Sequence, residues 1–120
     1  MSNCHCPDCR KASGGAFATT AICRKSDFSY TSGEAFIRSF ERPGEFTRYF
    51  CVTCGSTLPI PEHDAFRGCV GIPAGLLDVD PRKKPTKHLF TGSKAPWWDI
   101  LDDHTQFETW HPGYAPPPKA

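Results

Sequence analysis

The chain has 120 residues, of which 38% are apolar, and this length suits a single domain with a modest hydrophobic core. Its 14 Lys and Arg residues nearly balance 13 Asp and Glu residues, which argues against a nucleic-acid partner and against a polybasic membrane-binding segment. No apolar run approaches the roughly 20 residues that span a bilayer, and no signal peptide precedes the first cysteines, so we expect a cytoplasmic protein.

The first half of the chain is predicted to be β-structure. Residues 11–15 are small and flexible, and residues 16–23 then form an apolar, β-branched run that is typical of a buried strand. Residues 35–40 and 46–50 flank a loop that contains Pro and Gly, which predicts a β-hairpin. The second strand of that hairpin leads directly into Cys51.

The second half continues this mainly β pattern. Further strands are expected at residues 65–72 and 86–90, with a turn-rich segment between them. Twelve prolines argue against long helices and leave room for one short helical turn at residues 97–101. We therefore expect one β domain over residues 1–113, followed by a flexible, Pro-rich tail at residues 114–120.

Seven cysteines in a chain with no export signal favour metal binding or catalysis over disulfides. Two Cys-x-x-Cys pairs are present, Cys6 with Cys9 and Cys51 with Cys54. The separation of the two pairs is much longer than the roughly 15–20 residues of a compact zinc ribbon. If both pairs bind one Zn²⁺, the sheet between them must fold back to bring them together.

The second pair has the sequence of a zinc knuckle. Gly55 follows Cys54 directly, and a glycine there allows the positive φ that such a turn requires. Cys51 and Cys54 are therefore predicted to bind Zn²⁺. The alternative is two reduced cysteines at the entrance to a core strand.

The first cluster offers three thiols in a short stretch, Cys4, Cys6 and Cys9. Zinc that is held by three protein ligands keeps a fourth position for water or substrate, an arrangement typical of catalytic zinc. Arg10 and Lys11 follow at once and would offset the negative charge of three thiolates, although they also fit an ordinary solvated basic pair.

The remaining thiols and imidazoles are weaker candidates. Cys23 and Cys69 lie in apolar runs, where free cysteine behaves as a small hydrophobic residue. His5 would point away from its neighbouring thiols in an extended chain and is a poor fourth ligand. His88 fits either a pocket wall or a half-buried strand position.

The cysteine motif resembles that of the glutathione-dependent formaldehyde-activating enzyme family, which also includes centromere protein V. The resemblance extends in order over nearly the whole chain, through residues 4–14, 51–55, 75–78, 88–90 and 95–98. It implies a zinc-binding β fold of the Mss4-like type with short or no helices. It also implies carbon-sulfur lyase activity, in which glutathione and formaldehyde give S-hydroxymethylglutathione.

The resemblance also implies roles for the cysteines. Cys4, Cys6 and Cys9 match the family's three-cysteine catalytic site, and Cys51 and Cys54 match half of its four-cysteine structural site. Family members usually begin with a strand that carries Gly-x-Cys-x-Cys-Gly, and this sequence starts after that point. We therefore expect about one zinc per chain, held by the first three cysteines or by a merged site that joins Cys51 and Cys54 with two of those three.

Two classes of function follow from these observations. The leading hypothesis is a carbon-sulfur lyase that acts on an adduct of an aldehyde with glutathione or another thiol, with Arg10 and Lys11 binding the carboxylates of glutathione. The alternative is a zinc-stabilised binding module without turnover. A methionine sulfoxide reductase fits less well, because it would need Cys69 as a reactive thiol and the neighbours of Cys69 provide no positive charge.

Overall fold

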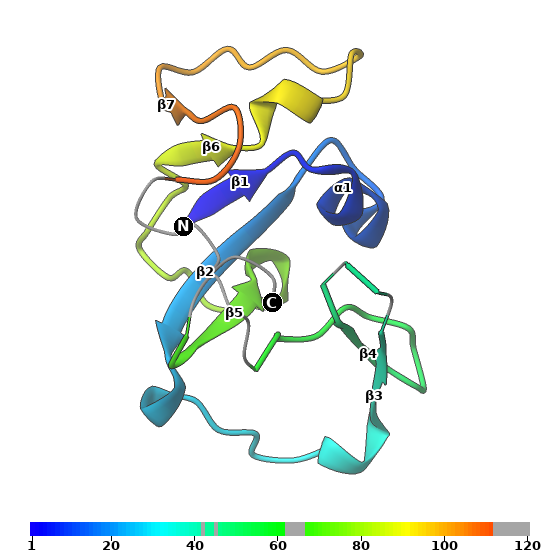
Figure 1. Cartoon of the computed structure of the whole chain (residues 1–120). Helices are drawn as coiled ribbons and strands as arrows, with labels where there is room; N and C mark the ends of the chain where they lie inside the picture. The colour runs from blue at the N-terminus through cyan, green and yellow to red at the C-terminus, as the bar shows by residue number, and fades with distance from the viewer. Residues whose placement is uncertain (42, 45, 62–66, 112–120) are drawn as a thin grey trace.

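The computed structural model describes residues 1–41, 43–44, 46–61 and 67–111, which form two β-sheets and one short α-helix. The predicted mainly β fold is therefore confirmed. The larger sheet has five strands in the order β5-β2-β1-β6-β7 (Figure 1). In that order they are Cys69–Pro73, Ala18–Arg24, Ser2–Cys4, Lys87–Leu89 and Thr105–Gln106.

Strand β1 lies at the centre of this sheet and carries the first cysteine of the cluster. It pairs antiparallel with β2, where Asn3 faces Thr19, and parallel with β6, where Cys4 faces Leu89. The backbone N–H of His5 continues this pairing by donating to the carbonyl of Leu89 at 2.8 Å. The start of the cysteine cluster is therefore held on both sides by backbone hydrogen bonds.

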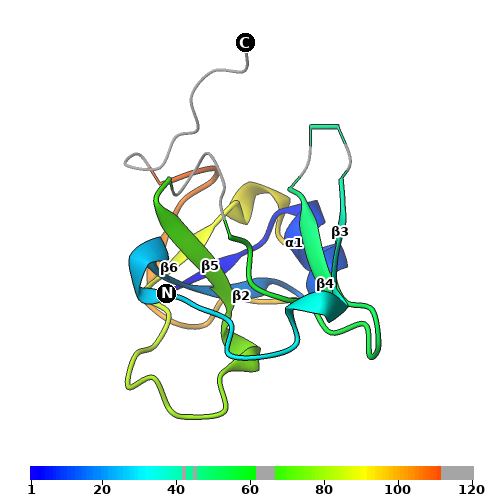
Figure 2. The same cartoon turned by 90° about the horizontal axis from the view of Figure 1, so that it is seen from below.

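The predicted hairpin forms the second sheet, with β3 at Ile37–Phe40 and β4 at Arg48–Cys51. Its strands are antiparallel and Phe40 faces Arg48. In both views the hairpin stands beside the larger sheet, next to the helix (Figures 1 and 2). The chain after the hairpin returns to the larger sheet through an isolated bridge between Ile60 and Gly71.

Helix α1 (Pro7–Ser13) was not predicted from the sequence. Its start is defined by Cys6, whose sulfur accepts a hydrogen bond from the backbone N–H of Cys9 at 3.3 Å, and by Pro at the first helical position. Its end is Gly14, which takes a left-handed φ of 71° and donates to the carbonyl of Arg10. A seven-residue helix is too short to show helical periodicity, so its signals are only its two caps.

The other predicted elements are found with shifted or shortened bounds. The strand predicted at 16–23 is β2, and the strand predicted at 86–90 is β6. Of the strand predicted at 65–72, the last part belongs to β5, whereas residues 65–66 lie outside the described residues. The tail predicted at 114–120 also lies outside them.

The helical turn predicted at residues 97–101 is wrong. A single turn closes earlier, where the N–H of Trp98 donates to the carbonyl of Ala95 at 3.2 Å, and residues 98–101 have no regular structure. Short 3₁₀ turns occur elsewhere, at Lys25–Asp27, Glu34–Phe36, Ala74–Leu76 and Thr91–Ser93. Within the described residues, none of the helices is both long enough and apolar enough to cross a bilayer.

The buried core is small and contains the cysteine cluster itself. Cys4, Cys6 and Leu89 form one buried group, and half-buried side chains pack against it from the end of the chain, including Phe90, Phe107 and Trp110. A core this small gains stability directly from a bound metal.

Candidate metal centre and adjoining cavity

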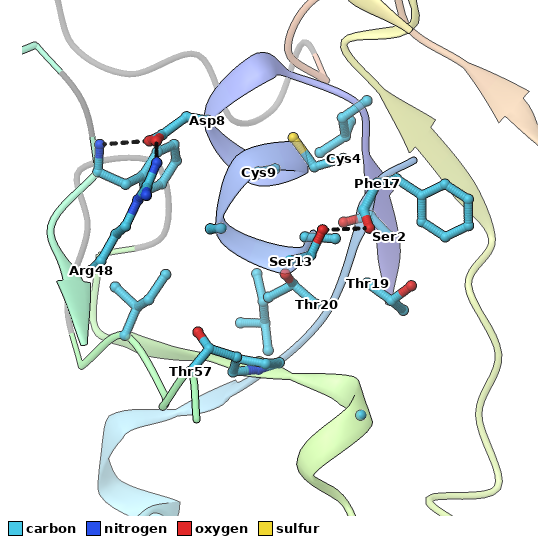
Figure 3. Close-up of a pocket in the computed structure, with 18 of the residues that line it drawn as sticks. Ser2, Cys4, Asp8, Cys9, Ser13, Phe17, Thr19, Thr20, Arg48 and Thr57 are labelled. Atoms are coloured by element: carbon cyan, nitrogen blue, oxygen red, sulfur yellow. Dashed lines mark hydrogen bonds and ion pairs between the residues drawn. The ribbon is translucent and has the colours of Figure 1, made fainter. Parts of the chain in front are cut away.

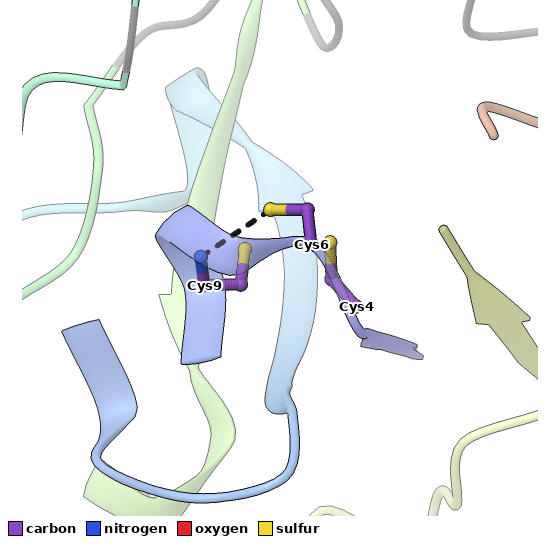
Figure 4. Close-up of side chains that lie close together, drawn as sticks. All are labelled: Cys4, Cys6 and Cys9. Carbon is purple, nitrogen blue, oxygen red and sulfur yellow. Dashed lines mark hydrogen bonds between the residues drawn. The ribbon is translucent and has the colours of Figure 1, made fainter. Parts of the chain in front are cut away.

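Three thiols meet where β1 passes into α1. Cys4 ends β1, Cys6 caps the helix and Cys9 lies in its first turn. Figure 4 shows the three side chains close together, and their sulfur atoms all lie within 4.8 Å of one another. Among the described residues, no other group of three or more His, Cys, Asp or Glu side chains places its potential ligand atoms this close together.

The donor set fits zinc. A tetrahedral site with Zn–S bonds of about 2.3 Å places its sulfurs about 3.8 Å apart. The observed upper limit of 4.8 Å is within a small side-chain adjustment of that value. Three soft sulfur ligands also favour Zn²⁺ over Mg²⁺ or Ca²⁺, which take oxygen ligands.

The three thiols differ in acidity because they share hydrogen bonds. Hydrogen bonds from the Cys4 and Cys9 thiols, together with backbone N–H groups at the start of α1, hold the pKa of Cys6 far below the usual thiol value. Hydrogen bonding to Cys6 and burial raise the pKa of Cys4. The pKa of Cys9 is also raised, by its hydrogen bonds with Cys4 and Cys6 and by burial. The shared hydrogen bonds therefore favour the thiolate form of Cys6 over the thiolate forms of Cys4 and Cys9.

A cavity of about 770 Å³ lies beside the cluster, between the larger sheet, α1 and the β3–β4 hairpin (Figure 3). Cys4 and Cys9 line it, whereas Cys6 is not among its lining residues. The volume is within the roughly 300–1,000 Å³ of typical small-molecule sites. Two of the three candidate ligands therefore face a space that can hold a small molecule.

Asp8 connects the cluster to the hairpin. Its carboxylate accepts a hydrogen bond from the guanidinium of Arg48 at 2.5 Å and another from the backbone N–H of Phe46 at 3.2 Å (Figure 3). Both Asp8 and Arg48 line the cavity. This ion pair holds β4 against the helix and forms one wall of the cavity.

Arg10 and Lys11 lie on the same helix but do not belong to the described lining of the cavity. The Nε of Arg10 donates to the backbone carbonyl of His5 at 3.4 Å, and Lys11 is exposed. Their binding of substrate carboxylates stays a prediction.

Cys51 and Cys54 form a separate pair at the end of the hairpin. Gly55 has the expected positive φ, 74°, and its N–H donates to the carbonyl of Cys51 at 2.8 Å. Hydrogen bonds from Ser56, and then from Cys51, hold the pKa of Cys54 below the usual thiol value. The pair does not join the three-thiol group, so the merged site considered from the sequence is not formed in this structure.

A chain of hydrogen bonds, which the sequence analysis did not identify, leads from the buried His5 through buried His88 to the exposed Asp102. Nε2 of His5 lies 2.8 Å from Nδ1 of His88, and Nε2 of His88 lies 3.1 Å from both carboxylate oxygens of Asp102. His5 and His88 are 0% and 2% exposed. His88 is thus fully buried and hydrogen-bonded on both sides of its ring, and it lies in β6.

The carboxylate sets the direction of this chain. Partial burial opposes ionisation of Asp102, but hydrogen bonds from His88 and from the His104 N–H hold its pKa below the usual value. A carboxylate only accepts, so Nε2 of His88 donates to Asp102. When the His88 ring carries that single proton, its Nδ1 accepts from Nε2 of His5. The remaining His5 atom, Nδ1, is buried and has no hydrogen-bond partner among the described residues. Burial lowers the pKa of His5, which favours its neutral form.

The ring of His5 is thus turned toward His88 and is not part of the three-thiol group. Its backbone carbonyl is held by Arg10 and also accepts from the Ser93 hydroxyl at 3.3 Å. The residue between Cys4 and Cys6 is fixed through both its side chain and its backbone.

Fold and site together define a small β domain with a group of three thiols that could hold a metal ion beside a cavity. The chain belongs to the family of glutathione-dependent formaldehyde-activating enzymes, which matches it over residues 1–93. The family assignment made from the cysteine motif is therefore confirmed. A comparison with curated proteins found no match.

Proposed function

We propose that the protein is a zinc-dependent carbon-sulfur lyase that makes and breaks the bond between a thiol sulfur and an aldehyde carbon. The observation that carries this proposal is the group of three thiols, two of which line a cavity of small-molecule size. The family match supports it, because that family is described by glutathione-dependent activation of formaldehyde.

Cys4, Cys6 and Cys9 would hold the zinc, which when bound supplies positive charge that favours the thiolate form of a substrate thiol at neutral pH. Cys4 and Cys9 line the cavity, so a substrate in the cavity would lie beside two of the residues that would hold the metal. The Asp8–Arg48 pair keeps the hairpin in place as the opposite wall. The cavity then orients the thiol and the aldehyde and limits access of water.

The reaction balances without a redox partner. The substrate thiol gives up its proton, and its sulfur forms a bond to the carbonyl carbon of the aldehyde. The π electrons of the C=O bond move to the oxygen, which takes up a proton. The product is a hemithioacetal, which is an S-hydroxymethyl thioether when the aldehyde is formaldehyde. The lyase direction is the same step in reverse.

The remaining predictions from the sequence belong to this proposal. Arg10 and Lys11 would receive carboxylates when the thiol is glutathione. Cys51 and Cys54 would contribute to metal binding with further ligands. A cytoplasmic location fits thiol chemistry, because the cytoplasm keeps cysteines reduced, and all seven cysteines are free in the structure.

The proposal is tested by the rate of exchange between free and adducted formaldehyde, measured by NMR with ¹³C-labelled formaldehyde and a thiol. We expect the zinc-loaded protein to accelerate exchange above the spontaneous rate, Cys6→Ser to abolish the acceleration, and Cys23→Ser to retain it. Cys23 is the matched control because it is a half-buried thiol in β2 outside the cluster. Thiol binding without acceleration would instead support the zinc-stabilised binding module.

A further inference from the structure

Arg48 places a guanidinium in the wall of the cavity beside the cysteine cluster. The described lining contains two cationic side chains, Arg48 and Lys87, whereas Arg10 and Lys11 are outside it. Lys87 also has an interaction within the chain. A guanidinium can bind a carboxylate through two parallel hydrogen bonds, which an ammonium cannot do. Arg48 is therefore the side chain of the wall that is best suited to recognise an anionic group on a substrate.

The ion pair with Asp8 uses only part of this guanidinium. Nη2 of Arg48 donates to Oδ1 of Asp8, and within the described part of the chain the guanidinium has no other hydrogen-bond partner. A guanidinium has five N–H donors, so those on Nε and Nη1 are left for a ligand. The Arg48 side chain is 33% exposed and lines the cavity, so a molecule in the cavity can reach it. A carboxylate can bind here while the pair with Asp8 stays intact.

Asp8 holds the guanidinium in one orientation. The Asp8 side chain is 16% exposed, and its carboxylate also accepts from the backbone N–H of Phe46 at 3.2 Å. Asp8 directly precedes Cys9, so one short helix supplies a candidate metal ligand and the partner that orients Arg48 (Figure 3). A donor that is fixed before the ligand arrives loses less conformational entropy on binding.

Hydroxyl groups add hydrogen-bonding capacity to the same wall. Thr20, Tyr49 and Thr57 line the cavity, and their hydroxyls make no hydrogen bond with the described residues. A carboxylate that leaves water needs several donors to replace its hydration. The cavity therefore offers polar partners to a charged substrate in addition to the guanidinium.

We infer that Arg48 binds a carboxylate of the thiol substrate, so that the cavity selects thiols that carry a carboxylate, such as glutathione. The inference rests on the proposed function, because it assigns a specificity-determining residue to the same site. It places one carboxylate of glutathione inside the cavity and leaves Arg10 and Lys11 for the second carboxylate.

The test is a calorimetric titration of the zinc-loaded protein with glutathione and with glutathione diethyl ester, which keeps the peptide and the thiol but removes both carboxylates. We expect the wild type to bind glutathione at least about tenfold more tightly than the ester. Arg48→Lys keeps a positive charge beside Asp8 but loses the two-pronged donor, so its preference should fall to about threefold or less. The matched control is Arg38→Gln, which removes an exposed arginine of the neighbouring strand outside the described lining and should keep the full preference.

The ratio of the two affinities separates recognition of the carboxylate from a structural role of Arg48. A structural role would weaken binding of glutathione and of the ester equally, and an unchanged ratio in Arg48→Lys would overturn the inference and leave the proposed function standing. A wild type that binds the ester as tightly as glutathione would also overturn it. If neither thiol binds, the proposed function fails and the inference fails with it.

A double variant covers the case in which Arg48→Lys does not fold. Asp8→Asn combined with Arg48→Gln removes both charges and leaves no buried carboxylate without a partner. We expect this protein to bind glutathione and the ester with about equal affinity. Retention of the wild-type preference in the double variant would overturn the inference.

Discussion

Replacement of His88 by Leu should destabilise the protein because it leaves a buried hydrogen-bond donor of His5 without its acceptor. His88 accepts the hydrogen bond from Nε2–H of His5, and His5 is completely buried. Leucine fills similar space but leaves this N–H without an acceptor. An unsatisfied buried donor costs about 1–3 kcal/mol, so we expect the free energy of unfolding to fall by about 2 kcal/mol.

For a domain of this size, such a loss lowers the melting temperature by roughly 6–12 °C. Urea unfolding of the zinc-loaded protein measures the free energy directly, and an unchanged m-value would show that the native surface is retained. The matched control is Asp102→Asn, which keeps an oxygen acceptor for Nε2 of His88 on a residue in contact with water. We expect this control to stay close to the wild type.

Histidine ¹⁵N NMR provides a second measurement that a simple loss of packing would not alter. In the wild type, both His5 and His88 should be neutral with the proton on Nε2, because the Asp102 carboxylate sets the direction of the chain. His88→Leu should release His5 from a single tautomer. An unfolding free energy within about 0.5 kcal/mol of the wild type would refute the reasoning, because it would mean that the buried His5 N–H needs no acceptor.

Three further outcomes are expected. Metal analysis of protein purified without added zinc should find about one zinc per chain. Chelation should lower the melting temperature, because the candidate ligands lie within the small core. An unchanged melting temperature after verified removal of the zinc would contradict this. Zinc affinity should rise with pH, because the raised pKa values of Cys4 and Cys9 mean that both thiols carry protons that zinc must displace. Competition with a coloured chelator between about pH 6 and pH 8 measures this, and an affinity independent of pH would count against the cluster as the binding site. Asp8→Ala should lower the free energy of unfolding by about 1–2 kcal/mol, because Arg48 and the N–H of Phe46 lose their acceptor and the ion pair is only partly exposed to water. An unchanged free energy in urea unfolding would show that the ion pair does not hold the hairpin.

Local sequence signals were sufficient for the hairpin, for strands β2 and β6 and for the cysteine cluster, whereas the short strands β1 and β7 were not predicted. Cys4, Cys6 and Cys9 are so close in the chain that any compact turn brings their sulfurs together. The Pro-Gly loop likewise predicts the pairing of its two flanking strands, because a hairpin brings together residues that are near in sequence. The resemblance to the family also depends on a local signal, because its first motif is a short run of cysteines.

Helix α1 shows a limit of prediction from local sequence patterns. Its terminal signals, Pro7 at the first helical position and Gly14 at the C-cap, are visible in the sequence, yet seven residues give no periodic pattern with which to recognise a helix. The helix matters because it places Cys9 beside Cys6 and directs Asp8 toward the hairpin.

Only the tertiary structure decided what surrounds the cluster. His5 meets His88 across 83 residues of sequence, Asp8 meets Arg48 across 40, and the cavity is built from segments along most of the chain. Arg10 and Lys11 are adjacent to the thiols in sequence, but they are not part of the described cavity lining. The sequence determined the cluster of candidate metal ligands because the spacing of Cys4, Cys6 and Cys9 is local. The hydrogen-bond chain and the cavity depend on contacts between distant segments, which are set by how the sheets and the helix pack.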